Sequence, residues 1–138
     1  MCAKIKRSKN APGTIHSLIT RHGKTAGLWG FENGSRYNAR IESIPLYWKD
    51  ISSNRGILQV DSFWEQDKEF ISKNSNPLNI GVLYNDIGEF AIITTPADDL
   101  VKLYHHRMPL ILSQKEADLF LEQPEIPLLT FGKVKLAA

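Results

Sequence analysis

Turn-forming residues divide this chain into short segments, and their spacing constrains the fold more than any other feature of the sequence. Asn, Asp, Gly and Pro gather at 11–14, 33–34, 54–56 and 85–88, where we expect turns. The segments between them are apolar or alternate between apolar and polar residues, and they predict strands over 14–20, 26–31, 37–44, 57–65, 78–84 and 89–95. No heptad repeat runs through the sequence, so a coiled coil is excluded.

Two capping-box patterns predict the helices. The first, Thr-Pro-Ala-Asp at 95–98, predicts a helix that runs to about Tyr104. The second, Ser-Gln-Lys-Glu at 113–116, precedes an apolar stripe and predicts a helix that stops before Pro124. We expect a short helix or irregular crossing at 45–51, a polar loop at 68–77 and a final strand at 128–136.

These elements indicate an α+β fold: a curved, barrel-like, mainly antiparallel β-sheet with two or three short helices. With 138 residues, the chain is expected to form a single domain over 1–138. The longest apolar runs, 90–93 and 108–112, are far shorter than the ~20 residues that a membrane helix needs. Residues 4–10 are basic and polar, and no apolar signal-peptide segment follows them. We therefore expect a cytoplasmic protein without membrane contact.

Positive charge is concentrated near the N-terminus. Residues 1–24 contain no acidic side chain, and their basic residues are Lys4, Lys6, Arg7, Lys9, Arg21 and Lys24. The whole chain has a net charge of only +2, so the remainder is net negative. A block of one sign suggests a polyanionic partner such as nucleic acid. The alternative is a solvated basic terminus.

The single cysteine, Cys2, cannot form an internal disulfide, which fits a reducing compartment and rules out cysteine-rich zinc sites. Initiator Met1 is normally removed when the second residue is small. The mature chain would then begin with an amine and a thiol on adjacent carbons, both partly nucleophilic near neutral pH. Such a pair reacts with an aldehyde to give a Schiff base and then a thiazolidine ring. The alternative is an untrimmed terminus with an incidental cysteine.

Other side chains are candidates for proton transfer. Glu65 adjoins Trp64, and a carboxyl beside bulky aromatic groups can have a raised pKa and act as acid and base; otherwise it is a surface glutamate. His105 and His106 are adjacent and cannot easily face one metal ion, so no metal site is expected. One of them acting on protons is more plausible, and the alternative is a polar helix end.

The aromatic residues Trp29, Phe31, Phe63 and Trp64 are read first as core and second as surfaces for base stacking. Alternation over 37–42 places Asn38, Arg40 and Glu42 on one face of the expected strand.

Taken in order, these motifs resemble those of the SRAP family (SOS-response-associated peptidase), whose members shield abasic sites by crosslinking to DNA. The resemblance rests on Met1-Cys2, on 10–14 (NAPGT), on 29–31 (WGF), on 37–42 (YNARIE), on 61–65 (DSFWE) and on 90–112, which contains HHRMPLIL. The chain is shorter than usual for the family, and Lys4 and Gln66 stand where Arg and Trp are usual.

The resemblance implies a role for each matching residue. Cys2 would be the nucleophile that joins the ring-opened sugar of an abasic site, and Asn38 would position its amine and thiol. Glu65 would shuttle protons, and His105 would stabilise or protonate the departing sugar oxygen. Phosphates next to the lesion would be bound by Lys4, Arg40 and Arg107, with Trp29 as a wedge or stacking surface.

The sequence therefore predicts a DNA-damage-response protein of the SOS response that binds single-stranded DNA at abasic sites. After removal of Met1 it would form a covalent thiazolidine crosslink through Cys2, and Schiff-base chemistry would also permit lyase activity. No cofactor or metal is implied, and we expect a monomer, associated with the nucleoid if bacterial or phage-encoded. Two alternatives stay open: a thiol peptidase that processes its own N-terminus, and a truncated, non-catalytic DNA-binding module.

Overall fold

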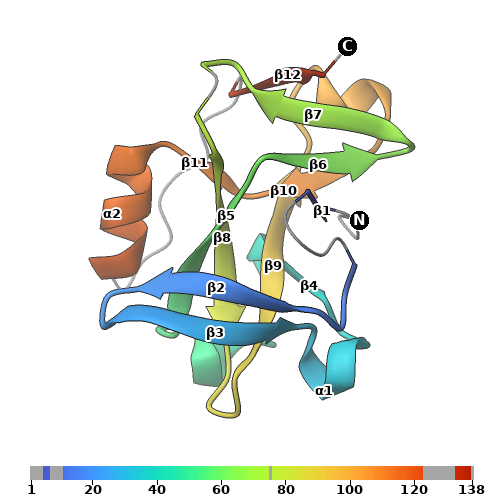
Figure 1. Ribbon diagram of the computed structural model, residues 1–138. Coiled ribbons are helices and arrows are strands. Elements are labelled where there is room, and N and C mark those ends of the chain that lie inside the picture. Colours follow the sequence, from blue (N-terminus) through green and yellow to red (C-terminus); the bar gives the residue numbers. More distant parts are fainter. Residues whose placement is uncertain (1–4, 7–10, 75, 123–132, 138) are drawn as a thin grey trace.

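The computed structural model describes residues 5–6, 11–74, 76–122 and 133–137, and their strands form two sheets (Figure 1). The larger sheet has the order β10-β9-β3-β2-β5-β8-β11, and β4 pairs with β9 beside this path. Its strands are β2 (Ile15–Thr20), β3 (Gly23–Trp29), β4 (Asn38–Arg40), β5 (Arg55–Val60), β8 (Leu78–Tyr84), β9 (Glu89–Pro96), β10 (Arg107–Pro109) and β11 (Ile111–Leu112).

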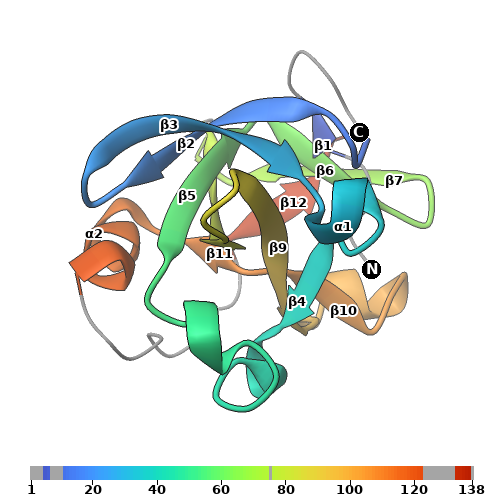
Figure 2. The same cartoon turned by 90° about the horizontal axis from the view of Figure 1, so that it is seen from below.

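This larger sheet closes on itself. β8 pairs with β9 through Val82↔Ile92, and β9 pairs in parallel with β3 through Trp29↔Phe90, so β9-β3-β2-β5-β8 form a ring. Figure 2 looks into this ring from below. β4 also runs parallel to β9, while the remaining pairs are antiparallel. The expected α+β fold with a barrel-like, mainly antiparallel sheet is confirmed.

The smaller sheet lies at the top of Figure 1 and has the order β1-β6-β7-β12. Its strands are antiparallel: β1 (Ile5–Lys6), β6 (Ser62–Glu65), β7 (Lys68–Ser72) and β12 (Val134–Leu136). The final strand expected at 128–136 is thus seen over its last residues, while 128–132 lie outside the described residues.

Two predictions about this region are wrong. The single strand expected at 57–65 is divided at Asp61, because β5 belongs to the ring and β6 to the smaller sheet. The loop expected at 68–77 begins with strand β7, because Phe70 is fully buried and stacks on Phe63 with 5.2 Å between ring centroids. Gln66 and Asp67 make the connecting turn with φ of 52° and 63°.

The helices agree only in part with the capping patterns. The second capping box is confirmed: Ser113 N donates to Glu116 Oε1 (2.8 Å), Glu116 N donates to Ser113 Oγ (3.2 Å), and α2 follows at Gln114–Glu122. The helix expected after the first box is wrong, because 95–96 continue strand β9 and pair with β10. Only the 3₁₀ turn η3 (Val101–Leu103) forms there, and Asp98 Oδ1 accepts from Val101 N (3.0 Å).

Short turns replace regular structure elsewhere. The turn expected at 33–34 is part of a tight helical turn, α1 (Phe31–Gly34), in which Glu32 and Asn33 have positive φ. The strand expected at 37–44 ends after β4 and gives way to the 3₁₀ turn η1 (Ile41–Ser43), followed by η2 (Lys49–Ile51). Among the helices of the described residues, none has the length and apolar character needed to cross a membrane.

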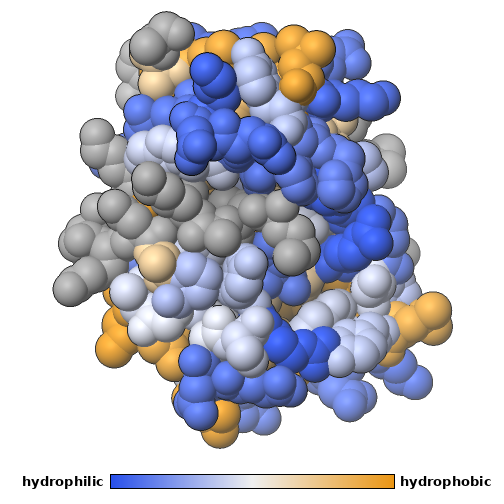
Figure 3. Space-filling model, turned by 90° about the vertical axis from the view of Figure 1, so that its right-hand side faces the viewer, coloured by the Kyte–Doolittle hydropathy of each residue, from blue (hydrophilic) through white to orange (hydrophobic). Residues whose placement is uncertain are grey.

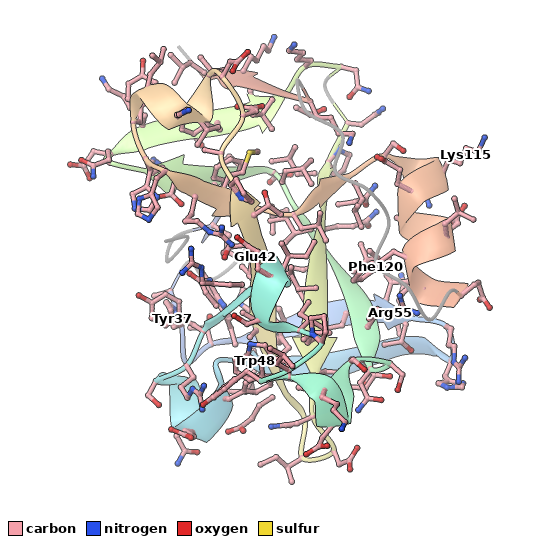
Figure 4. All side chains as sticks on the ribbon, turned by 180° about the vertical axis from the view of Figure 1, so that it is seen from behind. Tyr37, Glu42, Trp48, Arg55, Lys115 and Phe120 are labelled. Carbon is pink, nitrogen blue, oxygen red and sulfur yellow. The ribbon has the colours of Figure 1, made fainter. Side chains whose placement is uncertain are left out.

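Two groups of buried side chains fill the molecule. One lies between the ring and the smaller sheet and contains Trp29, Phe63, Phe70 and Phe90. The other lies between the ring and α2, where Phe120 packs against the sheet with the Arg55 guanidinium 5.3 Å from its ring (Figure 4). The core thus holds β6, β9 and β10 in a rigid arrangement, and these strands position the candidate site.

Candidate functional site

Glu65 is the last residue of β6, at the end of a hairpin strand. Only 4% of its surface is exposed, although the neighbouring turn residues Gln66 and Asp67 are exposed. Burial raises the pKa of the Glu65 carboxyl above its usual value, because a buried carboxylate loses hydration. A carboxyl with a raised pKa gives up its proton less readily than an exposed glutamate and can act as both acid and base.

His105 lies beside Glu65, although the two are far apart in the sequence. The distance between His105 Nδ1 and Glu65 Oε2 is 3.7 Å, longer than a direct hydrogen bond. His105 Nδ1 lies 3.1 Å from the backbone N–H of Arg107, from which it can accept, and 3.3 Å from the backbone oxygen of Arg107, to which it can donate when protonated. The structure thus brings together two of the residues that the sequence predicted for the site.

His106 is a neighbour of this pair that the sequence prediction left out. Its exposed ring stacks on that of His105, with centroids 4.4 Å apart and 29° between the planes. Loss of hydration, together with the positive charges of His105, Arg107 and Arg40, lowers the pKa of His106. Because only one of two adjacent histidines matched the family motif, the sequence contained no signal that the second would stack on the first.

Asn38 and Arg40 lie on β4, which pairs in parallel with β9 through Asn38↔Ile92 and Arg40↔Thr94. Asn38 is half-buried and its Nδ2 donates to the backbone oxygen of Tyr37 (2.9 Å). Arg40 is exposed and close enough for its charge to affect His106.

Arg107 is not an exposed cation. Only 4% of its surface is accessible, and its guanidinium forms a two-bond ion pair with Glu42, with Nη1–Oε2 at 2.6 Å and Nη2–Oε1 at 2.7 Å. Nη2 also donates to the backbone oxygen of Thr94 (2.9 Å). The expected phosphate contact of Arg107 does not fit this geometry, because both of its terminal nitrogens are used within the protein.

Glu42, the partner of Arg107, is a second residue that the sequence analysis did not assign. It lies on η1, the turn that follows β4, and Figure 4 labels it there. The hydrogen bonds from Arg107 lower the pKa of Glu42 from 4.5 to about 2. The alternation over 37–42 placed Glu42 on the same face as Asn38 and Arg40, and this was the signal in the sequence that could have identified Glu42. The ion pair ties the turn after β4 to β10.

Trp29 belongs to the core. It is fully buried, and its Nε1–H donates to the backbone oxygen of Tyr37 (3.0 Å). A side chain without exposed surface cannot stack on a base, so the role of Trp29 as a wedge or stacking surface does not fit the structure. Cys2 and Lys4 lie outside the described residues.

The surroundings of the site are polar. In Figure 1, the end of β6, which carries Glu65, points to the right-hand side of the molecule, and Figure 3 shows that this side is mainly hydrophilic. Within the part of the chain that the structure describes, no group of three or more His, Cys, Asp or Glu side chains could hold a metal ion. Glu65 and His105 can transfer protons and form hydrogen bonds.

The family profile of SRAP, "SOS response associated peptidase", matches residues 29–128. The chain belongs to the SRAP family. The matched part includes Asn38, Glu65 and His105, while Cys2 and Lys4 precede it. Membership supports a DNA-related function of the SOS response in general. No curated protein matches the chain in sequence.

Solved structures resemble this SRAP chain in fold. A protein from Bordetella bronchiseptica shares 20% identity over 98% of this chain and 88% of its own, with a TM-score of 0.75. A protein from Bacteroides thetaiotaomicron shares 22% identity over 83% and 65%, with a TM-score of 0.67. A phage-related protein from Bordetella bronchiseptica shares 20% identity over 86% and 70%, with a TM-score of 0.62.

Proposed function

We propose that this SRAP protein binds single-stranded DNA at abasic sites and forms a thiazolidine crosslink through Cys2 once Met1 has been removed. One observation carries the proposal: a buried glutamate with a raised pKa lies 3.7 Å from a histidine, within the part of the chain that matches the family. The reaction of an aldehyde with an amine and a thiol needs proton transfer in each of its steps, and such a pair can supply it.

The chemistry balances with the groups that the proposal names. The Cys2 amine adds to the C1 aldehyde of the ring-opened sugar, and Glu65 protonates the departing hydroxyl, which leaves as water. The thiol then adds to the carbon of the imine, its proton passes to the nitrogen, and the five-membered ring closes. His105 would protonate the ring oxygen when the sugar opens, and Asn38 would hold the amine and thiol.

The pairing of β1 supports the role of Cys2. Ile5 is fully buried and pairs with Phe63, so β1 runs antiparallel to β6, and residues before Ile5 are connected to the end of β1 nearer Glu65. Two residues separate Cys2 from Ile5, and the three Cα–Cα steps between them span at most about 11 Å. The anchor at Ile5 supports the proposal because it limits how far Cys2 can lie from β6.

Binding to undamaged single strands is expected to be weak and electrostatic. Arg40 is exposed beside the site, and it is proposed together with Lys4 as a phosphate contact. Each phosphate that is neutralised releases counterions. The logarithm of the association constant should therefore fall linearly with the logarithm of the salt concentration, with a slope of about −0.7 for each phosphate contact. A flat salt response, or a preference for duplex DNA, would contradict this mode of binding.

The test is crosslinking to an abasic single-stranded oligonucleotide, followed on a denaturing gel and by intact mass. The wild type should form an adduct whose mass is the sum of the two reactants less one water, and Cys2→Ala should form no stable adduct because no thiol closes the ring. Cys2→Ser keeps the amine and size, so it controls for loss of binding. An adduct with Cys2→Ala at the wild-type yield, or with a chain that retains Met1, would exclude the mechanism.

The other candidate roles give different outcomes with the same proteins. A thiol peptidase that processes its own N-terminus would remove Met1 from the wild type but leave it on Cys2→Ala when both are synthesised without methionine aminopeptidase. A non-catalytic module would bind the oligonucleotide with every variant and crosslink with none, the wild type included.

A further inference from the structure

Two aromatic side chains that the sequence analysis did not single out, Tyr47 and Trp48, reach the surface. Tyr47 is 61% exposed, and Trp48 beside it is half-buried. Their rings meet edge to face with centroids 4.8 Å apart, and Trp48 rests on the buried ring of Phe31 at 5.2 Å. Trp48 is labelled in Figure 4, on the segment that leads from η1 to η2. Tyr47 and Trp48 therefore form an aromatic surface that the buried ring of Phe31 supports.

The guanidinium of Arg36 completes this surface. Its central carbon lies 4.6 Å from the centre of the Tyr47 ring and 4.9 Å from that of Trp48. Glu32 approaches the same guanidinium at 3.6 Å. Planar aromatic rings and guanidinium groups are the surfaces on which proteins stack unpaired nucleic-acid bases.

A pocket of about 300 Å³ opens between these groups and is lined by Phe31, Arg36, Tyr47, Trp48, Asp50 and Asn85, among others. The pocket is also lined by the carboxylates of Glu32, Asp50 and Glu89, which disfavour a phosphate inside it. An uncharged base can enter and offer its N–H groups to Asp50. The pocket therefore suits the base of a nucleotide rather than its backbone.

β4 connects this pocket to the candidate catalytic site. Ala39 is fully buried, while Asn38 and Arg40 on either side of it are accessible, and Arg36 is accessible two residues before Asn38. The Cα atoms of Arg36 and Asn38 can be no more than about 7 Å apart, because two residues span no more. Arg36, Asn38 and Arg40 thus form a row of accessible polar groups that begins at the pocket and ends at Arg40, whose charge acts on His106.

We propose that Arg36, Tyr47 and Trp48 form a stacking subsite for an unpaired base of the DNA strand, close to the abasic position. The inference rests on the proposed binding of single-stranded DNA, and it adds a contact to an intact base that neither the family match nor the sequence analysis assigns. The phosphates would follow Arg40, and the base would lie against Tyr47 and Trp48.

The experiment measures reversible binding in a Cys2→Ala background, by fluorescence anisotropy at fixed salt. The oligonucleotide carries a non-reactive tetrahydrofuran abasic analogue, and in a second series one further base is removed at each flanking position in turn. Tyr47→Ala should weaken binding to the first oligonucleotide by about 5- to 100-fold, the range for loss of one base stack. One flanking position should carry the base that stacks on Tyr47. When the base at that position is removed, Tyr47→Ala and its Cys2→Ala parent should bind with the same affinity.

Leu46→Ala is the matched control, since Leu46 adjoins Tyr47 in the chain and is 84% exposed. It should bind within twofold of the parent on every oligonucleotide, and Tyr47→Phe should retain binding because it keeps the ring. The subsite is refuted if Tyr47→Ala binds as its parent does, if it loses the same factor on every oligonucleotide, or if the parent does not bind single strands. Failure of the wild type to crosslink would overturn the proposed chemistry and leave this result unaffected.

Discussion

The ion pair between Glu42 and Arg107 is expected to contribute measurable stability, and Glu42→Gln tests this. The pair joins the turn after β4 to β10 with two hydrogen bonds of 2.6 and 2.7 Å. The substitution keeps the shape of the side chain, but it removes the charge and turns an N–H₂ group or an uncharged oxygen toward the donors of Arg107. Arg107 itself stays buried with its charge less well compensated.

The magnitude follows from the pKa of Glu42. A drop from 4.5 to about 2 corresponds to about 3 kcal/mol if nothing screens the pair. Half of the Glu42 side chain is exposed, however, so water screens the interaction. Exposed pairs contribute up to about 1 kcal/mol, and the loss of one partner of a buried pair costs about 3–5 kcal/mol. We therefore expect Glu42→Gln to lose about 2 kcal/mol, which lowers the Tm by about 5–10 °C in a domain of this size.

The pH dependence gives a second, independent check. The pKa of Glu42 is lower in the folded protein than in the unfolded chain, so its contribution is fully present above pH 4.5 and is lost as the pH falls toward 2. Urea unfolding at pH 7, 5, 4 and 3 should therefore show a difference between wild type and Glu42→Gln that shrinks below pH 4.5. Glu32→Gln is the control, since Glu32 is 67% exposed and approaches Arg36 at 3.6 Å; it should change stability by no more than about 0.5 kcal/mol. Equal stability of Glu42→Gln and wild type at pH 7, or a deficit that is unchanged at pH 3, would refute the reasoning.

Three further outcomes are expected. Glu65→Gln should slow adduct formation by about 10²- to 10⁴-fold. It should also raise the Tm at pH 7, because the raised pKa of Glu65 means that stability is lost as the pH rises from the usual pKa of a glutamate through the pKa in the folded protein. A lower Tm would contradict this. His105→Ala should slow crosslinking more than His106→Ala, as measured by gel time courses, because His105 lies 3.7 Å from Glu65; equal effects would argue against its role. Gly30→Ala should lower the free energy of unfolding in urea by about 2 kcal/mol or more, since φ of Gly30 is 117° and a Cβ would lie 2.4 Å from the backbone of Gly34. Gly88→Ala should lower it by less, because φ of Gly88 is 86° and a Cβ there would meet no other atom within 4 Å.

The sequence determined the features of this protein that depend on near neighbours. Alternation predicted β2, and apolar runs on either side of a turn predicted β8 and β9, all with nearly correct bounds. The reciprocal hydrogen bonds of Ser113 and Glu116 form as the capping pattern predicted. Such contacts join residues only a few positions apart, so the pattern of side chains carries the information. The order of motifs along the chain also sufficed to indicate the family, which the profile match shows.

Local patterns failed where distant strands competed for the same residues. The capping box predicted between Thr95 and Asp98 is wrong, because pairing with β10 draws 95–96 into the sheet and Asp98 N donates to Met108 Sδ. Asp98 Oδ1 accepts instead from Val101 N, at the start of the following 3₁₀ turn. The polar segment after Gln66 forms β7 because Phe70 stacks on Phe63 in the core. In each case, burial and strand pairing outweigh a local preference.

Only the tertiary structure decided which candidate residues are accessible and which are neighbours. It brings Glu65 to His105, 40 positions away, and gives Arg107 the carboxylate of Glu42, 65 positions away. It also buries Trp29, which excludes the stacking role that the family resemblance implied, and it exposes Tyr47, which the sequence analysis did not single out. The physical reason is that exposure, pKa and ion pairing depend on the atoms that surround a side chain, and in a closed ring of strands those atoms come from distant parts of the chain.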